Sequence, residues 1–337
     1  MIEGHGDDLF QYGDRVRYNF SSNIPQGVNH AGLLTYLNDV GDIFRNYPEP
    51  SPKSVEELLA KRYSLVANNV IVGNGATEII YIIAHLFKNG RSSIFIPTFR
   101  EYQDACKLFC HKIKFVNTLD TIPDDSEVVW LCNPNNPTGL TFDYKKLITL
   151  IKTKKETLFV IDQAYGLYSV KRVLSVKDVL ENNNIVLLES FTKRFTVPGL
   201  RIGYAIGSKS VIEKLQSLRM PWSVNSIAIE AAKYLLNHAE EYSVDFHFLH
   251  EEALRMITQL REIGYKATDT DCNFFLTETP HGTSAELKEW LVKKYGILIR
   301  DASNFEGLSN KFFRIAVQDK DENNLLIKAL TEWIQLY

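Results

Sequence analysis

Short apolar runs alternate with longer amphipathic stretches over the first two thirds of the chain. The runs that are apolar almost throughout are IVG (71–73), IFIP (94–97), KFVN (114–117), EVVWLCN (127–133), LFVID (158–162), IVLLES (185–190) and YAIGS (204–208). Continuous apolar strands separated by helices are typical of a mostly parallel sheet that is covered on both faces. The pattern therefore predicts an α/β fold with a mostly parallel central sheet flanked by helices.

Sequence signals also predict where helices begin. Ser54 with Glu57, and Thr98 with Glu101, have the spacing of a capping box, in which a hydroxyl and a carboxylate satisfy the first amides of a helix. Further amphipathic stretches that predict helices lie near 144–155 and 174–182. We expect these helices to cover the faces of the sheet.

The alternation stops near residue 221, where the segment MPWSVNS interrupts it. The elements expected after it are helices at about 225–237 and 240–263, then CNFFLT, a helix over 284–294, ILIRD, FFRIAVQ and a helix over 321–335. That order suits a smaller α+β domain. We therefore expect a large domain over 45–235 and a small domain over 236–337, to which an N-terminal arm, 1–44, contributes.

Composition narrows the functions that remain. The chain has 337 residues, a net charge of −3 and 45% hydrophobic residues, which is an ordinary globular mixture without an electrostatic footprint for nucleic acid. No apolar run reaches the roughly 20 residues of a membrane span. The four cysteines lack disulfide or zinc spacing, and His247 with His250 has no accompanying metal-site motif, so we expect no metal. A reduced, cytoplasmic setting is the simplest interpretation.

Lys193 is the most unusual charged residue of the central region. It follows the apolar run IVLLES, with Ser190 three residues before it and Arg201 eight residues after it. A lysine at a strand end can keep its ammonium in water while its stem packs. It can also be a nucleophilic amine that condenses with an aldehyde cofactor, with a hydroxyl and a guanidinium nearby to bind an anion.

Three further motifs follow apolar strands, where open parallel sheets place their ligands. The turn GNGATE (73–78) can bind a phosphate on backbone amides at a helix N-terminus, or can be a plain tight turn. Pro134 and Pro137 make a rigid loop, which either fixes the amide of Asn136 or is only a turn. A carboxylate at Asp162 needs a partner such as a protonated pyridine nitrogen, unless it caps the next turn.

In chain order the motifs GATE, PTF, NPNNPTG, DQAY, SFTK and GLRIG resemble those of the class I/II aminotransferase family of pyridoxal-phosphate enzymes. The resemblance covers nearly the whole chain. It implies the fold-type I architecture, pyridoxal 5'-phosphate as the cofactor and a homodimer with shared active sites. It also implies a small amino-acid substrate. The charge and the lack of a long apolar run predict that neither nucleic acid nor a membrane is a partner.

The resemblance assigns the groups around the cofactor ring. Lys193 corresponds to the lysine that bonds to the cofactor aldehyde and later moves the α-proton of the substrate. Asp162 corresponds to the residue that keeps the pyridine nitrogen protonated. Asn136 and Tyr165 correspond to the residues that hydrogen-bond the phenolic oxygen, and Phe99 to the aromatic residue that stacks on the ring.

The resemblance also assigns two anion-binding regions. The residues that match the phosphate cup are Gly75, Ala76, Thr77, Ser190, Arg201 and, from the partner subunit, Tyr47. Arg314 resembles the arginine that binds the substrate α-carboxylate through a bidentate fork. The candidates for a second anionic site, which a phosphorylated substrate needs, are Arg300, His5 and Asn23. Arg300 could instead form a surface ion pair with Asp301 or Glu306.

Two reactions of the family fit the motifs, namely transamination of the histidinol-phosphate type and L-threonine-O-3-phosphate decarboxylation. The segments NFSSNI, PTFREY, PWSVN and ILIRDASNFEGL resemble the decarboxylase. GHGDD lacks the second glycine of its usual GHGG start, and Gln163 stands where an acidic residue is common. A regulator that binds the cofactor without turnover is a third possibility, but the arm is short and not basic, and Lys193, Asp162 and Arg314 are intact.

Overall fold

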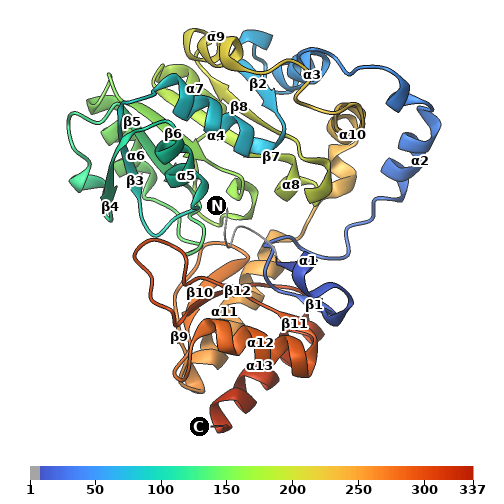
Figure 1. Cartoon of the computed structure of the whole chain (residues 1–337), viewed down its shortest axis with the longest axis vertical. Coiled ribbons are helices and arrows are strands. Elements are labelled where there is room, and N and C mark those ends of the chain that lie inside the picture. The colour runs from blue at the N-terminus through green and yellow to red at the C-terminus, as the bar shows by residue number, and fades with distance from the viewer. Residues whose placement is uncertain (1–7, 337) are drawn as a thin grey trace.

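The structure, a computed structural model, describes residues 8–336, which form two lobes stacked along the long axis (Figure 1). The upper lobe contains a sheet with the strand order β2-β8-β7-β6-β5-β3-β4. In chain order its strands are β2 (Val70–Gly73), β3 (Arg91–Phe95), β4 (Lys112–Val116), β5 (Val128–Cys132), β6 (Leu158–Asp162), β7 (Ile185–Ser190) and β8 (Gly203–Gly207). Strand β8 runs in the opposite direction to the other six strands of this sheet, so the predicted mostly parallel sheet is confirmed.

Both faces of this sheet are covered, and most of its strands are buried on both sides. Val70 and Val72 pack in one core cluster and Ile71 packs in another, as expected where successive side chains point to opposite faces. The first cluster is shared with α3 (Lys53–Arg62), α6 (Tyr144–Thr153), α7 (Val176–Glu181) and α10 (Ser226–Asn237). The second is shared with α4 (Gly75–Leu86), α5 (Glu101–Leu108) and α9 (Lys209–Leu218).

The register brings the motif-bearing strand ends to one edge of the sheet. Cys132 pairs with Asp162 between β5 and β6, and Ser190 pairs with Gly203 between β7 and β8. Gly203 also pairs with Gly73 at the end of β2. Residues that are far apart in sequence are therefore neighbours at this edge, which faces the lower lobe.

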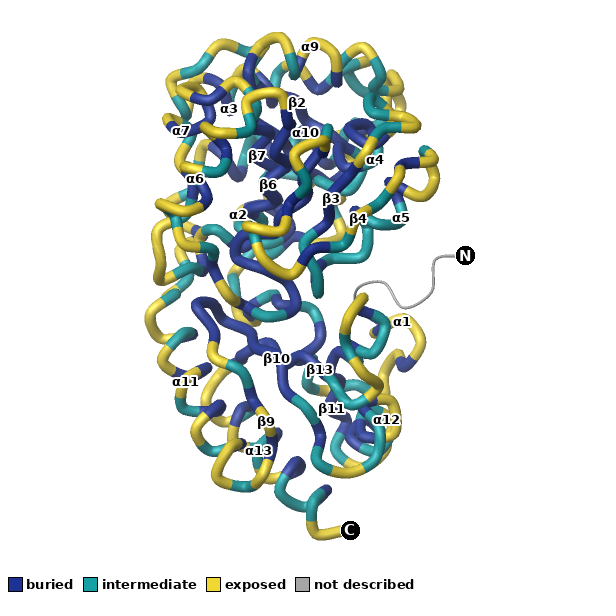
Figure 2. The backbone as a smooth tube through the Cα atoms, turned by 90° about the vertical axis from the view of Figure 1, so that its left-hand side faces the viewer, coloured by how far each residue is buried: buried dark blue, intermediate teal, exposed yellow. Residues whose placement is uncertain are grey.

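The lower lobe contains an antiparallel sheet with the strand order β12-β13-β10-β9. Its elements are α11 (Phe246–Glu262), β9 (Lys266–Ala267), β10 (Phe274–Glu278), α12 (Ser284–Tyr295), β12 (Arg300–Asp301), β13 (Phe312–Ala316) and α13 (Lys320–Gln335). Strands β10 and β13 form the buried centre of this lobe (Figure 2). Its core also contains Phe20 from the N-terminal segment, together with Tyr165 and Tyr168 from the loop after β6. The two lobes are thus joined by packed side chains.

The N-terminal segment contacts both lobes. After α1 (Leu9–Tyr12), strand β1 (Tyr18–Asn19) pairs with β11 (Ile297–Leu298) of the lower lobe. Helix α2 (Ala31–Asp39) contributes Leu33 to the core of the upper lobe. The chain between them, around Ser22, therefore runs across the junction of the lobes.

Two local predictions are wrong. The hydroxyl of Ser54 donates to Glu49 at 2.5 Å, and α3 follows Pro52 without a side-chain cap. The hydroxyl of Thr98 donates to Asn135 at 2.9 Å, so it does not cap α5. In both cases the hydroxyl has a nearby partner that competes with the helix amides. The expected strand ILIRD is also divided, because β11 and β12 belong to different sheets.

Within residues 8–336 no helix has the length and apolar character to cross a membrane. The same residues contain no group of three or more His, Cys, Asp or Glu side chains arranged to hold a metal ion.

Candidate active site

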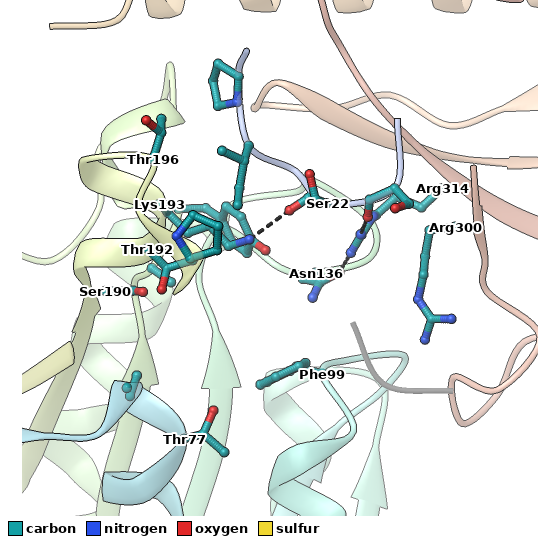
Figure 3. Close-up of a pocket in the computed structure, with 18 of the residues that line it drawn as sticks. Ser22, Thr77, Phe99, Asn136, Ser190, Thr192, Lys193, Thr196, Arg300 and Arg314 are labelled. Atoms are coloured by element: carbon teal, nitrogen blue, oxygen red, sulfur yellow. Dashed lines mark hydrogen bonds between the residues drawn. The ribbon is translucent and has the colours of Figure 1, made fainter. Parts of the chain in front are cut away.

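A cavity of about 680 Å³ lies where the carboxyl ends of the upper strands meet the lower lobe (Figure 3). Residues from the upper sheet, its helices, the N-terminal segment and the lower sheet all line it. The sequence-predicted residues that it brings together are Gly75, Ala76, Thr77, Phe99, Asn136, Asp162, Tyr165, Ser190, Lys193, Arg201, Arg300 and Arg314.

Two of the predicted residues that the structure describes are not among those that line the cavity. Tyr47 is 86% exposed, and its ring lies 5.6 Å from that of Trp222 on the outer surface. Asn23 is fully buried with a left-handed backbone, φ 51°. Asn23 nevertheless acts on a residue of the cavity. Burial raises the pKa of Tyr165 above its ordinary value, and the charge of Arg314 and the side chain of Asn23 both oppose this rise. His5 lies outside the described residues.

Lys193 extends into the cavity from α8 (Phe191–Arg194), the short helix that follows β7. Its Nζ donates to the carbonyl oxygen of Ser22 at 2.8 Å and lies 5.5 Å from the centre of the Tyr165 ring. The hydroxyl of Tyr168 donates to the carbonyl of Lys193 at 2.7 Å, which fixes the backbone of the helix. The amine therefore points into the cavity, as Figure 3 shows.

Asp162 ends β6 with a side chain that is only 6% exposed. Its Oδ1 accepts from the backbone N–H of Ala164 at 3.0 Å, and its Oδ2 accepts from the hydroxyl of Tyr102 at 2.7 Å. Burial raises the pKa of Asp162, whereas these two hydrogen bonds and the charge of Lys193 lower it. The carboxylate caps the following turn, as one interpretation expected, and it also faces the cavity.

The N-terminus of α4, Arg201 and two glycines meet at one end of the cavity. Gly75 has φ +76°, and a Cβ placed on it would lie 2.6 Å from Nη2 of Arg201. A Cβ on Gly203 would lie 2.3 Å from the backbone nitrogen of Ala76. The two glycines therefore allow the helix end, its free amides and the guanidinium to lie close together. Such an arrangement attracts a phosphate group.

Two arginines line the opposite, lower side of the cavity. Arg300 and Arg314 are register partners on β12 and β13, and their side chains are 6% and 4% exposed. Arg314 donates to the amide oxygen of Asn136 and to the carbonyl of Ser21. Arg300 donates to Asn304 at 3.0 Å, and burial lowers its pKa while Asp8 and Asp301 oppose this. Arg300 is buried at the cavity, so it does not have the surface position that the alternative of an ion pair assumed.

The loops that carry Phe99 and Asn136 are tied to each other. The side chain of Asn135 donates to the carbonyl of Pro97 at 2.9 Å and accepts from Thr98 at 2.9 Å. These bonds fix the loop after β3 against the loop after β5. Phe99 and Asn136 are therefore held on neighbouring walls of the cavity, as Figure 3 shows.

Sequence reasoning missed several residues that contact the candidate groups directly, among them Ser22 and Tyr102. The carbonyl of Ser22 accepts from Lys193, and nothing in the sequence pattern indicates which backbone oxygen of the N-terminal segment reaches that far. Tyr102, which donates to Asp162, was detectable. It lies three residues after Phe99, near the start of the helix predicted after Thr98, so a second aromatic residue close to Phe99 was visible in the sequence.

The comparisons with known proteins agree with this architecture. Residues 19–330 match the family model of aminotransferase class I and II, and the chain belongs to this family. Its members are enzymes that depend on pyridoxal 5'-phosphate.

Particular relatives fall into two groups. The crystal structure of L-threonine-O-3-phosphate decarboxylase from Porphyromonas gingivalis is 35% identical, with a TM-score of 0.91, covering 94% of this chain and 99% of that one. A protein of Caldanaerobacter subterraneus, named provisionally as a threonine-phosphate decarboxylase, is 34% identical over 97% of this chain and 92% of its own length. Histidinol-phosphate aminotransferase from Ruminiclostridium cellulolyticum is 28% identical over 84% of this chain and 82% of its own length.

The residues of the cavity fit the family's cofactor. Pyridoxal 5'-phosphate carries a phosphate, an aldehyde, a phenolic oxygen and a basic ring nitrogen, so it needs an anion site, an amine, hydrogen-bond donors and a carboxylate. The close approach of Gly75 and Arg201 leaves an anion site at the end of α4 that a larger residue would fill. Lys193, Asn136 and Asp162 are the amine, the amide and the carboxylate in the same cavity.

Proposed function

We propose that this chain is an L-threonine-O-3-phosphate decarboxylase that uses pyridoxal 5'-phosphate. The observation that carries the proposal is the pair of buried arginines, Arg300 and Arg314, on adjacent strands of the wall opposite α4. Two guanidinium groups at one cavity suit a small substrate with two anionic groups. A phosphorylated amino acid has a carboxylate and a phosphate.

The cofactor would be held at four places. The helix end with Gly75, Ala76, Thr77, Ser190 and Arg201 would bind its phosphate. Asp162 would lie beside the ring nitrogen and keep it protonated, and Phe99 would cover the ring. Asn136 and Tyr165 would donate to the phenolic oxygen. When bound, the cofactor supplies an aldehyde for the amine and a ring that accepts electrons from the substrate.

The protein's own groups then decide which bond at the α-carbon breaks. Arg314 would hold the α-carboxylate, with Asn136 orienting the guanidinium, and Arg300 would hold the phosphate. Fixing both anions leaves the substrate little freedom to turn, and orientation of the reacting bond is a large part of catalysis. After the carboxyl group leaves as carbon dioxide, the protonated amine of Lys193 would deliver a proton to the α-carbon.

Transamination of the histidinol-phosphate type is the second candidate. The same pair of arginines favours it in one respect, because an amino donor such as glutamate carries two carboxylates. Histidinol phosphate itself has no carboxylate, so Arg314 would lack an anionic partner in that half of the reaction. The identities of 34% and 35% to proteins named for the decarboxylase, against 28% for the aminotransferase, further support the first candidate.

We further propose that the enzyme is a homodimer in which Tyr47 completes the partner's phosphate site. Tyr47 is exposed and lies away from the cavity of its own chain. It adjoins Trp222, which is 50% exposed. Phe44 and Met220, which are close to these two residues in sequence, are 76% and 73% exposed. Large exposed apolar side chains of this kind mark surfaces that associate.

One pair of assays tests the proposal. Protein loaded with pyridoxal 5'-phosphate is incubated with L-threonine-O-3-phosphate and, separately, with histidinol phosphate plus 2-oxoglutarate. We expect release of carbon dioxide in the first assay and no glutamate in the second. Glutamate formation without carbon dioxide release would select the aminotransferase, and no reaction in either assay would contradict both candidates.

A further inference from the structure

Tyr102 lies one layer beneath the cavity wall and is not among the residues that line it. It belongs to α5 and is 1% exposed. Its hydroxyl donates to Oδ2 of Asp162 at 2.7 Å, while the amide of Ala164 donates to Oδ1 at 3.0 Å. Each oxygen of the buried carboxylate thus has one donor from the protein, and the carboxylate still faces the cavity.

The ring of Tyr102 is held on two sides. Trp130 of β5 stacks on it with the ring centres 5.7 Å apart and an interplanar angle of 20°. Phe99 meets it in a T-shaped contact at 5.7 Å and 83°. Aromatic contacts of both kinds favour one arrangement over others. The hydroxyl is therefore fixed at the carboxylate, and the same ring supports the aromatic side chain at the cavity.

The hydrogen bond has an electrostatic consequence. Burial favours the neutral form of Asp162, and a donated hydrogen bond favours the charged form. Burial also raises the pKa of the Tyr102 hydroxyl well above its ordinary value, so this group keeps its proton and stays a donor. Without this donor the carboxylate loses one of the interactions that keep it charged in an apolar setting.

We propose that Tyr102 is a positioning residue, which holds Asp162 charged toward the ring nitrogen of the bound cofactor and supports Phe99 beside it. This inference deepens the proposed function. It rests on cofactor binding in the cavity and is independent of whether the enzyme decarboxylates or transaminates.

Two matched variants test the inference. Tyr102→Phe removes the hydroxyl and keeps the ring between Trp130 and Phe99. Tyr265→Phe is the control, because its hydroxyl also makes one buried hydrogen bond, to the carbonyl of Leu330 at 3.0 Å, in the core of the lower lobe. The measurements are the melting temperature, the dissociation constant of pyridoxal 5'-phosphate by equilibrium dialysis, and the absorbance of the loaded enzyme as a function of pH.

We expect Tyr102→Phe to bind the cofactor about tenfold more weakly, since a hydrogen bond to a charged group is lost. The pH midpoint of the absorbance change should move, and kcat should fall with KM nearly unchanged. Tyr265→Phe should lower the melting temperature alone. The inference is overturned if Tyr102→Phe matches Tyr265→Phe in cofactor affinity and in the absorbance titration. Failure of the unmodified protein to bind the cofactor would instead contradict the proposed function.

Discussion

At the scale of single residues, Lys193 offers the most direct chemical test. Its amine lies in the cavity at 2.8 Å from the carbonyl of Ser22. Reduction of the loaded protein with borohydride should therefore leave the cofactor attached to the peptide that contains Lys193. Lys193→Met should abolish this adduct, whereas Lys146→Met, at an exposed helix position, should retain it. Mass spectrometry that places the adduct on another lysine would refute the assignment.

The two arginines should differ in which part of the substrate they recognise. Arg300→Gln should lower kcat/KM for L-threonine-O-3-phosphate about 100-fold, because charge-assisted hydrogen bonds to the phosphate are lost. Binding of L-threonine, which has no phosphate, should change little. Substrate titrations of the loaded enzyme, followed by absorbance, measure both affinities.

Arg314→Gln supplies the contrasting result. It should weaken L-threonine and its phosphate ester by similar factors, because both carry the α-carboxylate, and should leave cofactor affinity unchanged. The assignment fails if Arg314→Gln weakens cofactor binding as strongly as substrate binding. Melting curves of both variants check that the loss of a buried guanidinium has not unfolded the lower lobe.

Most of the site residues predicted from the sequence line the cavity, and the reason is positional. Asp162, Ser190 and Gly75 each lie at or just after the end of an apolar strand, and parallel strands bring those ends to one edge. Tyr47 and Asn23 are different, because no periodic pattern fixes where an irregular segment runs. The structure places one on the outer surface and buries the other.

At the scale of elements, a buried ion pair joins α3 to β2 and to the segment after α9. Arg219 contacts Glu56, and the two side chains are 7% and 5% exposed. Glu56 also accepts from the backbone N–H of Val72 at 3.1 Å, and Arg219 donates to the carbonyl of Val72 at 3.2 Å. The ion pair therefore provides hydrogen-bond partners for both the backbone N–H and the carbonyl oxygen of Val72.

Glu56→Gln should lower the free energy of unfolding by about 3 kcal/mol, since it leaves the buried charge of Arg219 without a carboxylate. Urea unfolding followed by circular dichroism measures the change. The control is Glu181→Gln, which breaks the exposed pair of Glu181 with Lys177 and should change stability by less than about 0.5 kcal/mol. Equal effects of the two substitutions would show that the buried pair is not structurally important.

The sequence predicted helices and strands correctly where burial determines the pattern of apolar residues. It failed where local hydrogen bonds determine how a helix is capped. The strands of the upper sheet are visible in sequence because both of their faces are covered. The run ILIRD looks equally continuous, yet β11 pairs with β1 and β12 pairs with β13. Which strands become partners depends on tertiary packing. Ser54 and Thr98 show the same limit, since capping spacing does not reveal a competing acceptor.

At the scale of the whole molecule, cofactor binding should stabilise the folded state. The groups expected to hold the cofactor come from β6, α4, α8 and the loops after β3 and β5. A ligand that binds only the folded state stabilises it by about 2.7 kcal/mol at a concentration of 100 times its dissociation constant. Melting temperature should therefore rise with added pyridoxal 5'-phosphate in unmodified protein, and Lys193→Met should respond less at equal concentration. A melting temperature that is independent of the cofactor would contradict binding at this cavity.

If each active site of the proposed dimer contains residues from both chains, mixing two inactive variants should restore activity. Lys193→Ala removes the amine and Tyr47→Ala removes the side chain expected to reach the partner's site, so each homodimer should have little activity. In a mixed dimer, the Lys193 of one chain and the Tyr47 of the other complete one site. Random pairing of equal amounts should then restore about a quarter of the unmodified activity. If mixing restores none although mixed dimers are detected by mass spectrometry, Tyr47 does not act across the interface, and its exposed position beside Trp222 needs a different explanation.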